Sequence, residues 1–343
     1  MEHSKKPTRK DFMKPSQVLS FPFLLPFVMG GFIVSGIYYG GWGYWSGFLF
    51  ISVIHPVLDL LGGQTFEARD LEKYHYGTVQ TMLLLSVPLQ VIYIVTTFII
   101  INTRSLSYFE WMGVSLSLSF TTAGLGMTAG HELIHRKFWW EKRLGDFLYL
   151  TVGYPHFPIE HVHGHHKNVA TPLDPATAKK NETLYEFWVR SVLGGFKSAW
   201  NHERWQMQFV LSYMSFILIC LSIVLVWNFH VLLFYMVHCV GAILMLEAVN
   251  YLQHYGLKRK KLGPHEYEPV QYYHSWESPQ NMTNWFLFNL GRHAEHHRYP
   301  TKPFYQLQPK PLNNIMPVGY SLMFLMTFVP PFWRSVMNPR ITS

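Results

Sequence analysis

Long stretches without a charged side chain are the feature that most limits how this chain can fold. The first runs from Pro15 to Leu58 and contains no Asp, Glu, Lys or Arg. A helix needs about 20 apolar residues to cross the hydrocarbon layer of a membrane, so this run has room for two crossings. Charged residues make up only 14% of the chain, against about 25% in a typical soluble domain. These features predict an all-α integral membrane protein.

We expect about six transmembrane helices, because the stretches with at most one charged residue divide into that number of spans. The predicted spans are 21–39, 44–61, 79–101, 109–130, 209–229 and 231–250. A further uncharged stretch, 311–333, is interrupted by several prolines, so we expect it to pack on protein or at the membrane surface. No internal repeat or low-complexity tract divides the chain, which we therefore expect to form a single domain over residues 1–343.

The distribution of positive charge predicts the orientation of these spans. Lys and Arg concentrate in the cytoplasmic loops of membrane proteins. If the N-terminus is cytoplasmic, segments 62–78, 131–208 and 251–343 are cytoplasmic too, and every Lys and Arg except Arg104 lies on that side. The net charge of +8 then describes one membrane face and does not indicate a nucleic-acid-binding surface.

Histidine is unusually frequent, with 19 residues in the chain. Most of the predicted cytoplasmic histidines gather in HELIH (131–135), EHVHGHH (160–166) and RHAEHH (292–297), while His254 follows the sixth span. Residues three or four apart share one face of a helix, so such imidazoles can meet one ion. Crowded imidazoles without a metal would lack hydrogen-bond partners when neutral and would repel each other when charged. The clusters hold more imidazoles than the about four to six positions of one ion, which predicts two metal ions.

The ligand type leaves several metals open, because imidazole suits iron, zinc, copper and nickel. Cys220 and Cys239 lie in apolar stretches away from the clusters, which argues against iron–sulfur and structural zinc sites. A site built from nitrogen ligands beside apolar helices favours iron that activates oxygen for attack on a lipid-like substrate.

Two other functional classes deserve comparison with this hypothesis. The first cluster matches HExxH, which is typical of zinc peptidases with Glu132 as general base, but that interpretation leaves the other clusters unexplained. A metal transporter would place its ligands near the middle of the spans. The spanning histidines, His55, His230 and His238, are instead scattered.

These motifs resemble those of the membrane-bound alkane monooxygenases, which are non-haem diiron hydroxylases, and the chain is similar to the hydroxylase subunit of xylene monooxygenase. The resemblance extends from the first span to the C-terminus. It is carried by HELIHR (131–136), EHVHGHH (160–166), TPLDPAT (171–177), NYLQHYGL (250–257) and RHAEHH (292–297). Gln253 stands where alkane hydroxylases commonly have Glu, and at this position the chain is closer to the xylene enzyme. Glu295 stands where Asp is common.

The resemblance implies O2-dependent hydroxylation of a terminal C–H bond in a hydrophobic substrate, with two iron ions as cofactor. A medium-chain n-alkane is the expected substrate, and the methyl group of xylene or toluene is the alternative. The implied iron ligands are His131, His135, His161, His165, His166, His254, His293, His296 and His297. Candidates for orienting these imidazoles through their second ring nitrogen are Glu132, Glu160, Asp174, Asn250, Gln253 and Glu295.

Electrons are expected from another protein, because the sequence contains no flavin motif and no C-x-x-C pair for a fused rubredoxin. The resemblance implies a separate rubredoxin or a ferredoxin-type reductase. Its expected docking site is the basic run from Lys258 to Lys261, which could equally serve as a positive-inside anchor. The resemblance also implies a bacterial inner membrane, and the distribution of positive charge predicts that the N-terminus and the diiron site are on its cytoplasmic side.

Overall fold

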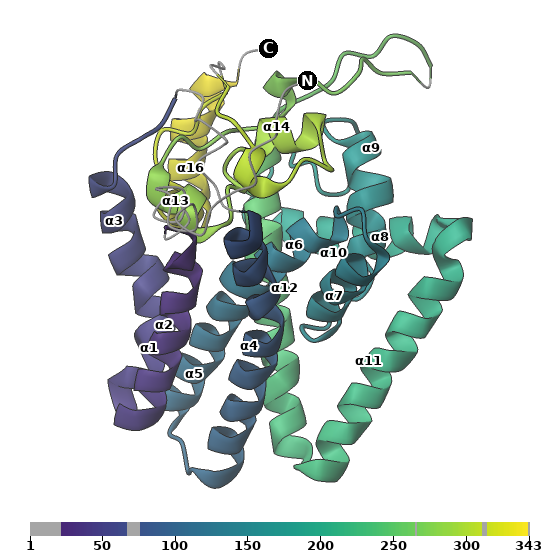
Figure 1. The fold of residues 1–343 in the computed structure, drawn as a ribbon. Coiled ribbons are helices and arrows are strands. Elements are labelled where there is room, and N and C mark those ends of the chain that lie inside the picture. Colours follow the sequence, from purple (N-terminus) through teal and green to yellow (C-terminus); the bar gives the residue numbers. More distant parts are fainter. Residues whose placement is uncertain (1–21, 67–75, 265, 311–313, 342–343) are drawn as a thin grey trace, which may run out of the picture.

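A computed structural model describes residues 22–66, 76–264, 266–310 and 314–341. Within these ranges the protein is helical and has no strand, only isolated bridge pairs between extended residues. Long helices run side by side through one half of the molecule (Figure 1). Short helices from Asn281 to Met337 cover one end of this bundle, which we call the capped end. The predicted all-α class is confirmed.

The bundle contains helices of very different regularity. Its continuous members are α1 (Leu25–Tyr39), α4 (Tyr76–Thr103), α11 (Gln206–Val226) and α12 (Phe229–His254). Two further rods are built from consecutive pieces. The first rod contains η3 (Gly41–Trp45), α2 (Ser46–Leu49), η4 (Phe50–Ile54) and α3 (His55–Leu61). The second rod contains α5 (Tyr108–Thr121), η6 (Thr122–Met127) and α6 (Thr128–Ile134).

The remaining helices lie near the capped end. Between the rods come α7 (Trp139–Leu150), α8 (Phe157–Ile159), η7 (Glu160–His165), α9 (His166–Asn168), α10 (Leu184–Asn201) and η8 (Glu203–Trp205). After α12 follow η9 (Tyr272–His274), α13 (Asn281–Phe286), α14 (His293–Arg298), η10 (Phe304–Gln306), α15 (Tyr320–Thr327), α16 (Pro330–Met337) and η11 (Asn338–Arg340). The segments η4, η6 and η7 are π-helical, and such segments often occur at functional sites.

Four helices in the described ranges are long and apolar enough to cross a membrane. They are Gly41–Leu61, Gly77–Thr103, Glu203–Val226 and Phe229–His254. The two other predicted spans differ in length or polarity. The apolar helix Pro22–Gly36 is shorter than these four. The rod from α5 to α6 contains many hydroxyl side chains and does not reach the same hydropathy.

The polarity of α5 follows from its position, because it packs against α2, α4 and α12 instead of facing only lipid. Its buried hydroxyl groups donate to carbonyl oxygens one turn earlier in the same helix. Ser115 donates to Trp111, Ser119 to Ser115 and Thr121 to Ser117, each over 2.8 Å. Backbone acceptors therefore satisfy these hydroxyls inside the bundle. The hydropathy of a protein-surrounded helix can consequently be lower than that of a lipid-facing one.

The chain after α12 folds back onto the bundle through buried polar links. In α3, the Asp59 carboxylate accepts hydrogen bonds from the backbone N–H and the hydroxyl of Thr283, at 2.7 and 2.8 Å. The fully buried Trp276 donates its Nε1–H to the carbonyl oxygen of Tyr255 over 2.9 Å. Tyr320 and Trp333 are also buried, so the proline-interrupted stretch 311–333 packs on protein where it is described.

Helices α6 and α7 touch through their backbones at Gly145. A Cβ atom there would lie 2.9 Å from the carbonyl oxygen of Gly130 and 2.7 Å from Cγ2 of Ile134. Only glycine permits this approach, because the obstructing atoms include backbone that cannot rotate away. The contact fixes the position of α6, which carries the first histidine motif.

We predict that Gly145→Ala lowers the free energy of unfolding by about 1–3 kcal/mol, since overpacking forces α6 and α7 apart. Gly31→Ala is the matched control, because a Cβ at this position in α1 meets no atom within 4 Å. Thermal unfolding of both variants in one detergent, followed by circular dichroism, measures the difference. Equal melting temperatures for Gly145→Ala and the wild type would contradict the close packing.

Candidate metal centre

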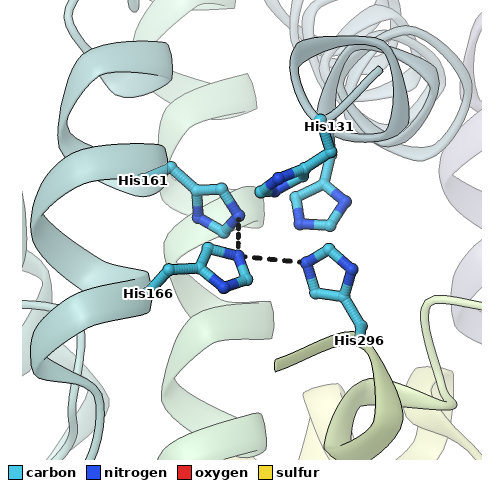
Figure 2. Close-up of side chains that lie close together, drawn as sticks. His131, His161, His166 and His296 are labelled. Atoms are coloured by element: carbon cyan, nitrogen blue, oxygen red, sulfur yellow. Dashed lines mark hydrogen bonds between the residues drawn. The ribbon is translucent and has the colours of Figure 1, made fainter. Parts of the chain in front are cut away.

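Nine histidines converge at the capped end of the bundle and form two groups. The five-histidine group contains His131, His135, His161, His166 and His296, and the four-histidine group contains His165, His254, His293 and His297. Within each group, one ring nitrogen of every member lies within 4.8 Å of those of the others. Figure 2 shows the rings of His131, His161, His166 and His296 turned toward a common centre. These nine are the histidines that the sequence motifs single out.

Local helix geometry explains why these side chains meet. His131 and His135 are four residues apart at the end of α6, and His293 and His297 have the same spacing in α14. His161 and His166 are five residues apart, a spacing that shares one face only where the helix is π-helical, as in η7. The wider turn of η7 therefore brings two imidazoles together that a regular α-helix would separate.

Two adjacent pairs of histidines connect the groups. His165 belongs to the four-histidine group and His166 to the five-histidine group, and His297 and His296 are divided in the same way. Because neighbours in the chain are held a fixed short distance apart, the two groups must lie side by side. The arrangement is that of two adjacent ligand sets, not one large cluster.

The distances between ring nitrogens fit metal coordination. The Nε2 atoms of His161 and His166 are 3.0 Å apart, and those of His166 and His296 are 3.1 Å apart. In the other group, His293 Nε2 lies 3.0 Å from Nε2 of both His254 and His297. Metal–nitrogen bonds of about 2.1 Å place neighbouring ligand atoms about 3.0 Å apart at octahedral angles and about 3.4 Å at tetrahedral angles.

Buried nitrogens without a hydrogen-bond partner also fit a metal site. The Nε2 atoms of His131 and His135 are buried and have no hydrogen-bond partner among the described residues. Burying such an atom without a partner is costly. A metal ion at the centre of the five-histidine group would satisfy both lone pairs.

Burial keeps the imidazoles in the ligating form. It lowers the pKa of His161 and His296 well below the usual value for histidine, and the neighbouring imidazoles add to the effect. The pKa of His297 is lowered in the same way, by burial first and then by its neighbours. Neutral imidazoles offer lone pairs to a metal. The site is therefore built to bind a cation with nitrogen ligands.

Asp174 is the predicted orienting residue that contacts a histidine of these groups. The Nδ1–H of His165 donates to Asp174 Oδ2 over 2.9 Å. The same carboxylate accepts from the Thr177 hydroxyl over 2.6 Å and from the backbone N–H of Ala176 over 2.9 Å. These bonds fix the ring so that Nε2 faces its group. The TPLDPAT motif supplies both Asp174 and Thr177, and the role of Thr177 was not expected from the sequence.

Two of the predicted orienting carboxylates contact basic groups instead of imidazoles. Glu132 Oε1 lies 3.0 Å from Arg136 Nη2 and accepts a hydrogen bond from the backbone N–H of Phe304 over 3.1 Å. Glu295 Oε1 lies 2.9 Å from Lys302 Nζ and 3.3 Å from Lys310 Nζ. Both carboxylates therefore connect the histidine helices to η10 and its flanking residues.

The other three predicted orienting residues are Gln253, Asn250 and Glu160, which lie close in the chain to His254 and His161. Gln253 donates to the Tyr320 hydroxyl over 3.0 Å, and Asn250 donates to Glu247 over 3.3 Å. Glu160 borders a small cavity together with His161, His165 and Glu247. The Gln253 hydrogen bond links α12 to α15 beside the site.

An apolar cavity of about 80 Å³ is lined by residues that lie close in the chain to the histidine motifs. Phe120, Val249 and Phe324 line it, and so do Thr128 and Leu290. Thr128 precedes His131, and Leu290 precedes His293, by three residues each. The cavity therefore begins within about one helical turn of both groups and can hold one end of an apolar chain beside them.

Comparison with known proteins agrees with this geometry. The fatty acid desaturase family matches residues 109–317. The chain is 35% identical to an alkane 1-monooxygenase of Pseudomonas putida over 88% of its own length and 80% of the relative's. It is 34% identical to the alkane 1-monooxygenase of Ectopseudomonas oleovorans, covering 88% of this chain and 79% of the relative. The chain is 28% identical to the xylene/toluene monooxygenase hydroxylase component of Pseudomonas putida, over 92% of this chain and 86% of the relative. The chain is thus an integral membrane oxidoreductase that belongs to the alkane 1-monooxygenase family.

Proposed function

We propose that this protein is a diiron hydroxylase that converts a medium-chain n-alkane to the corresponding terminal alcohol with O2 as co-substrate. The observation that carries the proposal is the division of nine clustered imidazoles into adjacent groups of five and four. Each group has enough nitrogen ligands for one first-row transition metal ion. The family membership of the chain supports an oxygenase over other uses of such a site.

Iron is the metal that this ligand set and this family favour. Neither cysteine belongs to a histidine group, so the proposed ligands are nitrogen atoms alone. Two irons bound there would supply the reduction of O2 and the insertion of one of its oxygen atoms into a C–H bond, with the other leaving as water. The protein holds the ligands in place through Asp174 and provides the apolar cavity for the substrate.

The cavity supports a hydrophobic substrate that arrives from the bilayer. Its lining is mostly aliphatic and aromatic, which suits an alkane chain. The same lining includes Phe120, Phe286 and Phe324. These rings also favour the methyl group of xylene or toluene as the second candidate substrate, in agreement with the more distant relative.

The zinc peptidase hypothesis has less support. His131 and His135 share their group with three further imidazoles, which leaves little room for the open position that a catalytic zinc requires. Glu132, the general base of that hypothesis, lies 3.0 Å from Arg136. An ion pair of this kind would compete with proton abstraction from a metal-bound water.

We place the protein in a bacterial inner membrane as a single domain, with the N-terminus and the capped end in the cytoplasm. The electron donor, a rubredoxin or a ferredoxin-type reductase, docks at the exposed side chains of Lys258, Lys260 and Lys261. Arg259 has a structural role instead. Its guanidinium donates to the carbonyl oxygens of Glu268 and Lys167, at 2.7 and 2.9 Å. This anchors the basic segment beside His166, which gives electrons a short path to the irons.

We predict that iron-loaded wild-type protein contains about two irons per chain, as two separate ligand sets require. His296→Ala and His254→Ala each remove one ligand from a different group and should lower the iron content. Metal analysis of protein in mild detergent measures this, and isotopically labelled O2 should place label in the alcohol formed from an alkane. His163→Ala is the control, because this ring stacks on Trp205 outside both groups. One zinc per chain, unchanged in these variants, would contradict the proposal.

A second prediction concerns Asp174, which orients His165. Asp174→Ala should weaken iron binding at the four-histidine group by about 10- to 100-fold, because the imidazole loses its fixed orientation. The five-histidine group should keep its iron, so a stoichiometric titration should change from two equal steps to a strong and a weak one. Asp146→Ala is the control, since that carboxylate pairs with Arg143 and contacts no histidine of the groups. Unchanged affinity in Asp174→Ala would remove the orienting role.

A third prediction concerns the docking surface. Replacing Lys258, Lys260 and Lys261 together by Glu should slow reduction by a bacterial rubredoxin about tenfold at low salt, because electrostatic attraction to the acidic donor is lost. Stopped-flow reduction at several salt concentrations measures the rate, and the difference should shrink as salt increases. Reduction by dithionite should be unaffected. The control replaces Lys142, Arg143 and Lys197, which are exposed elsewhere, by Glu. Equal slowing in both variants would contradict docking at this segment.

A further inference from the structure

His55, one of the residues that line the apolar cavity near the metal centre, carries a buried polar atom that alkane binding does not explain. Four polar side chains are among the lining residues of this cavity, and three of them have clear partners. Thr128 donates to the carbonyl oxygen of Ala123 over 3.2 Å, and the Tyr320 hydroxyl accepts from Gln253 over 3.0 Å. Ser321 Oγ is 2.7 Å from Nδ1 of His55. The fourth residue, His55, retains a free nitrogen.

His55 is held in a fixed orientation from one side of its ring. Besides the contact with Ser321, its Nδ1 lies 3.4 Å from Asp59 Oδ2. That carboxylate is itself fixed by the backbone N–H and hydroxyl of Thr283, and the Thr283 hydroxyl accepts from the backbone N–H of Tyr320 over 3.0 Å. Residues of α3, α13 and α15 thus position one imidazole. A carboxylate beside Nδ1 favours the tautomer with the proton on Nδ1.

The opposite nitrogen, Nε2, is buried and has no hydrogen-bond partner among the described residues. Only 1% of His55 is exposed. The ring lies against Phe286, with centroids 4.8 Å apart, and against Phe50 at 6.0 Å. Aromatic neighbours cannot satisfy a nitrogen lone pair. A polar atom in such surroundings lowers the affinity of the cavity for a pure hydrocarbon and raises it for a ligand that completes the hydrogen bond.

We infer that His55 Nε2 binds the hydroxyl group of an otherwise apolar ligand, so that the cavity prefers an apolar alcohol to the hydrocarbon of the same length. The hydroxyl donates its proton to the Nε2 lone pair, while the apolar part of the ligand contacts the lining beside Thr128 and Leu290. This inference rests on the proposed function, because it names the ligand class of the cavity that serves the hydroxylase. The alcohol is either a substrate that is already oxygenated at one position or the retained product.

Equilibrium binding tests this inference without iron or turnover. The protein is placed in lipid nanodiscs with a carbon-13 label on its methionine methyl groups, and the Met245 signal reports on the cavity that this residue lines. Undecane, decanol and methyl nonyl ether are titrated separately, since they have equal length but differ in hydrogen bonding. Decanol should bind about tenfold or more tightly than undecane, because it satisfies a buried acceptor. The ether should bind like undecane, because it has no proton to donate.

Variants of His55 identify the group responsible. His55→Phe should remove the preference for decanol, whereas His55→Gln, which keeps a polar atom near the position of Nε2, should retain part of it. Phe120→Leu is the matched control, because it alters the cavity wall without a hydrogen-bonding group and should change all three affinities alike. Thermal unfolding confirms that each variant is folded. Equal affinity of the wild type for decanol and undecane, or a full preference in His55→Phe, would overturn the inference.

Turnover separates this inference from the proposed function. If iron-loaded protein hydroxylates no hydrocarbon while the decanol preference depends on His55, the proposed function fails and the ligand assignment stands. If undecane is hydroxylated and the wild type shows no preference for decanol, the proposed function stands and the ligand assignment fails. Among active preparations, oxidation of decanol at its far end identifies the alcohol as a substrate, and competitive inhibition without oxidation identifies it as the product.

Discussion

The burial of many neutral imidazoles with converging lone pairs is the constraint on which the rest of this structure depends. Such a cluster is unstable by itself, because neighbouring Nε2 atoms near 3.0 Å cannot all act as donors and acceptors. Two bound cations, one in each group, would resolve this conflict. The surrounding elements serve to place the ligands: Gly145 lets α6 approach α7, η7 widens the helix between His161 and His166, and Asp174 orients His165.

The sequence predicts much of this arrangement because helical spacing is visible in it. The pairs His131–His135 and His293–His297 follow from a spacing of four residues, and the membrane class follows from the uncharged runs. The sequence could not predict that His161 and His166 belong to the same group, because no residue pattern in the motif indicates a π-helix. The division of adjacent residues such as His296 and His297 between two groups depends on how α14 packs over the bundle. Hydropathy likewise could not show that α5 is surrounded by protein.

The two chemical requirements of the protein meet at one end of the bundle. The proposed irons would need polar, nitrogen-rich surroundings and a connection to the proposed electron donor, whereas the substrate would need an apolar path. The capped end would supply the first through η7, α14 and the basic segment that Arg259 anchors to Lys167. The cavity between η6, α12 and α15 supplies the second, and Thr128 and Leu290 belong to helices or turns that lead directly into histidine motifs. His55 adds selectivity within this apolar path.

An iron-specific anomalous scattering map of the loaded protein tests the central claim most directly. The account predicts two iron peaks, one inside the five-histidine group and one inside the four-histidine group, with nitrogen atoms of the nine imidazoles as their protein ligands. A single peak shared by both groups would contradict it. So would a peak confined to His131 and His135 with the remaining histidines unoccupied.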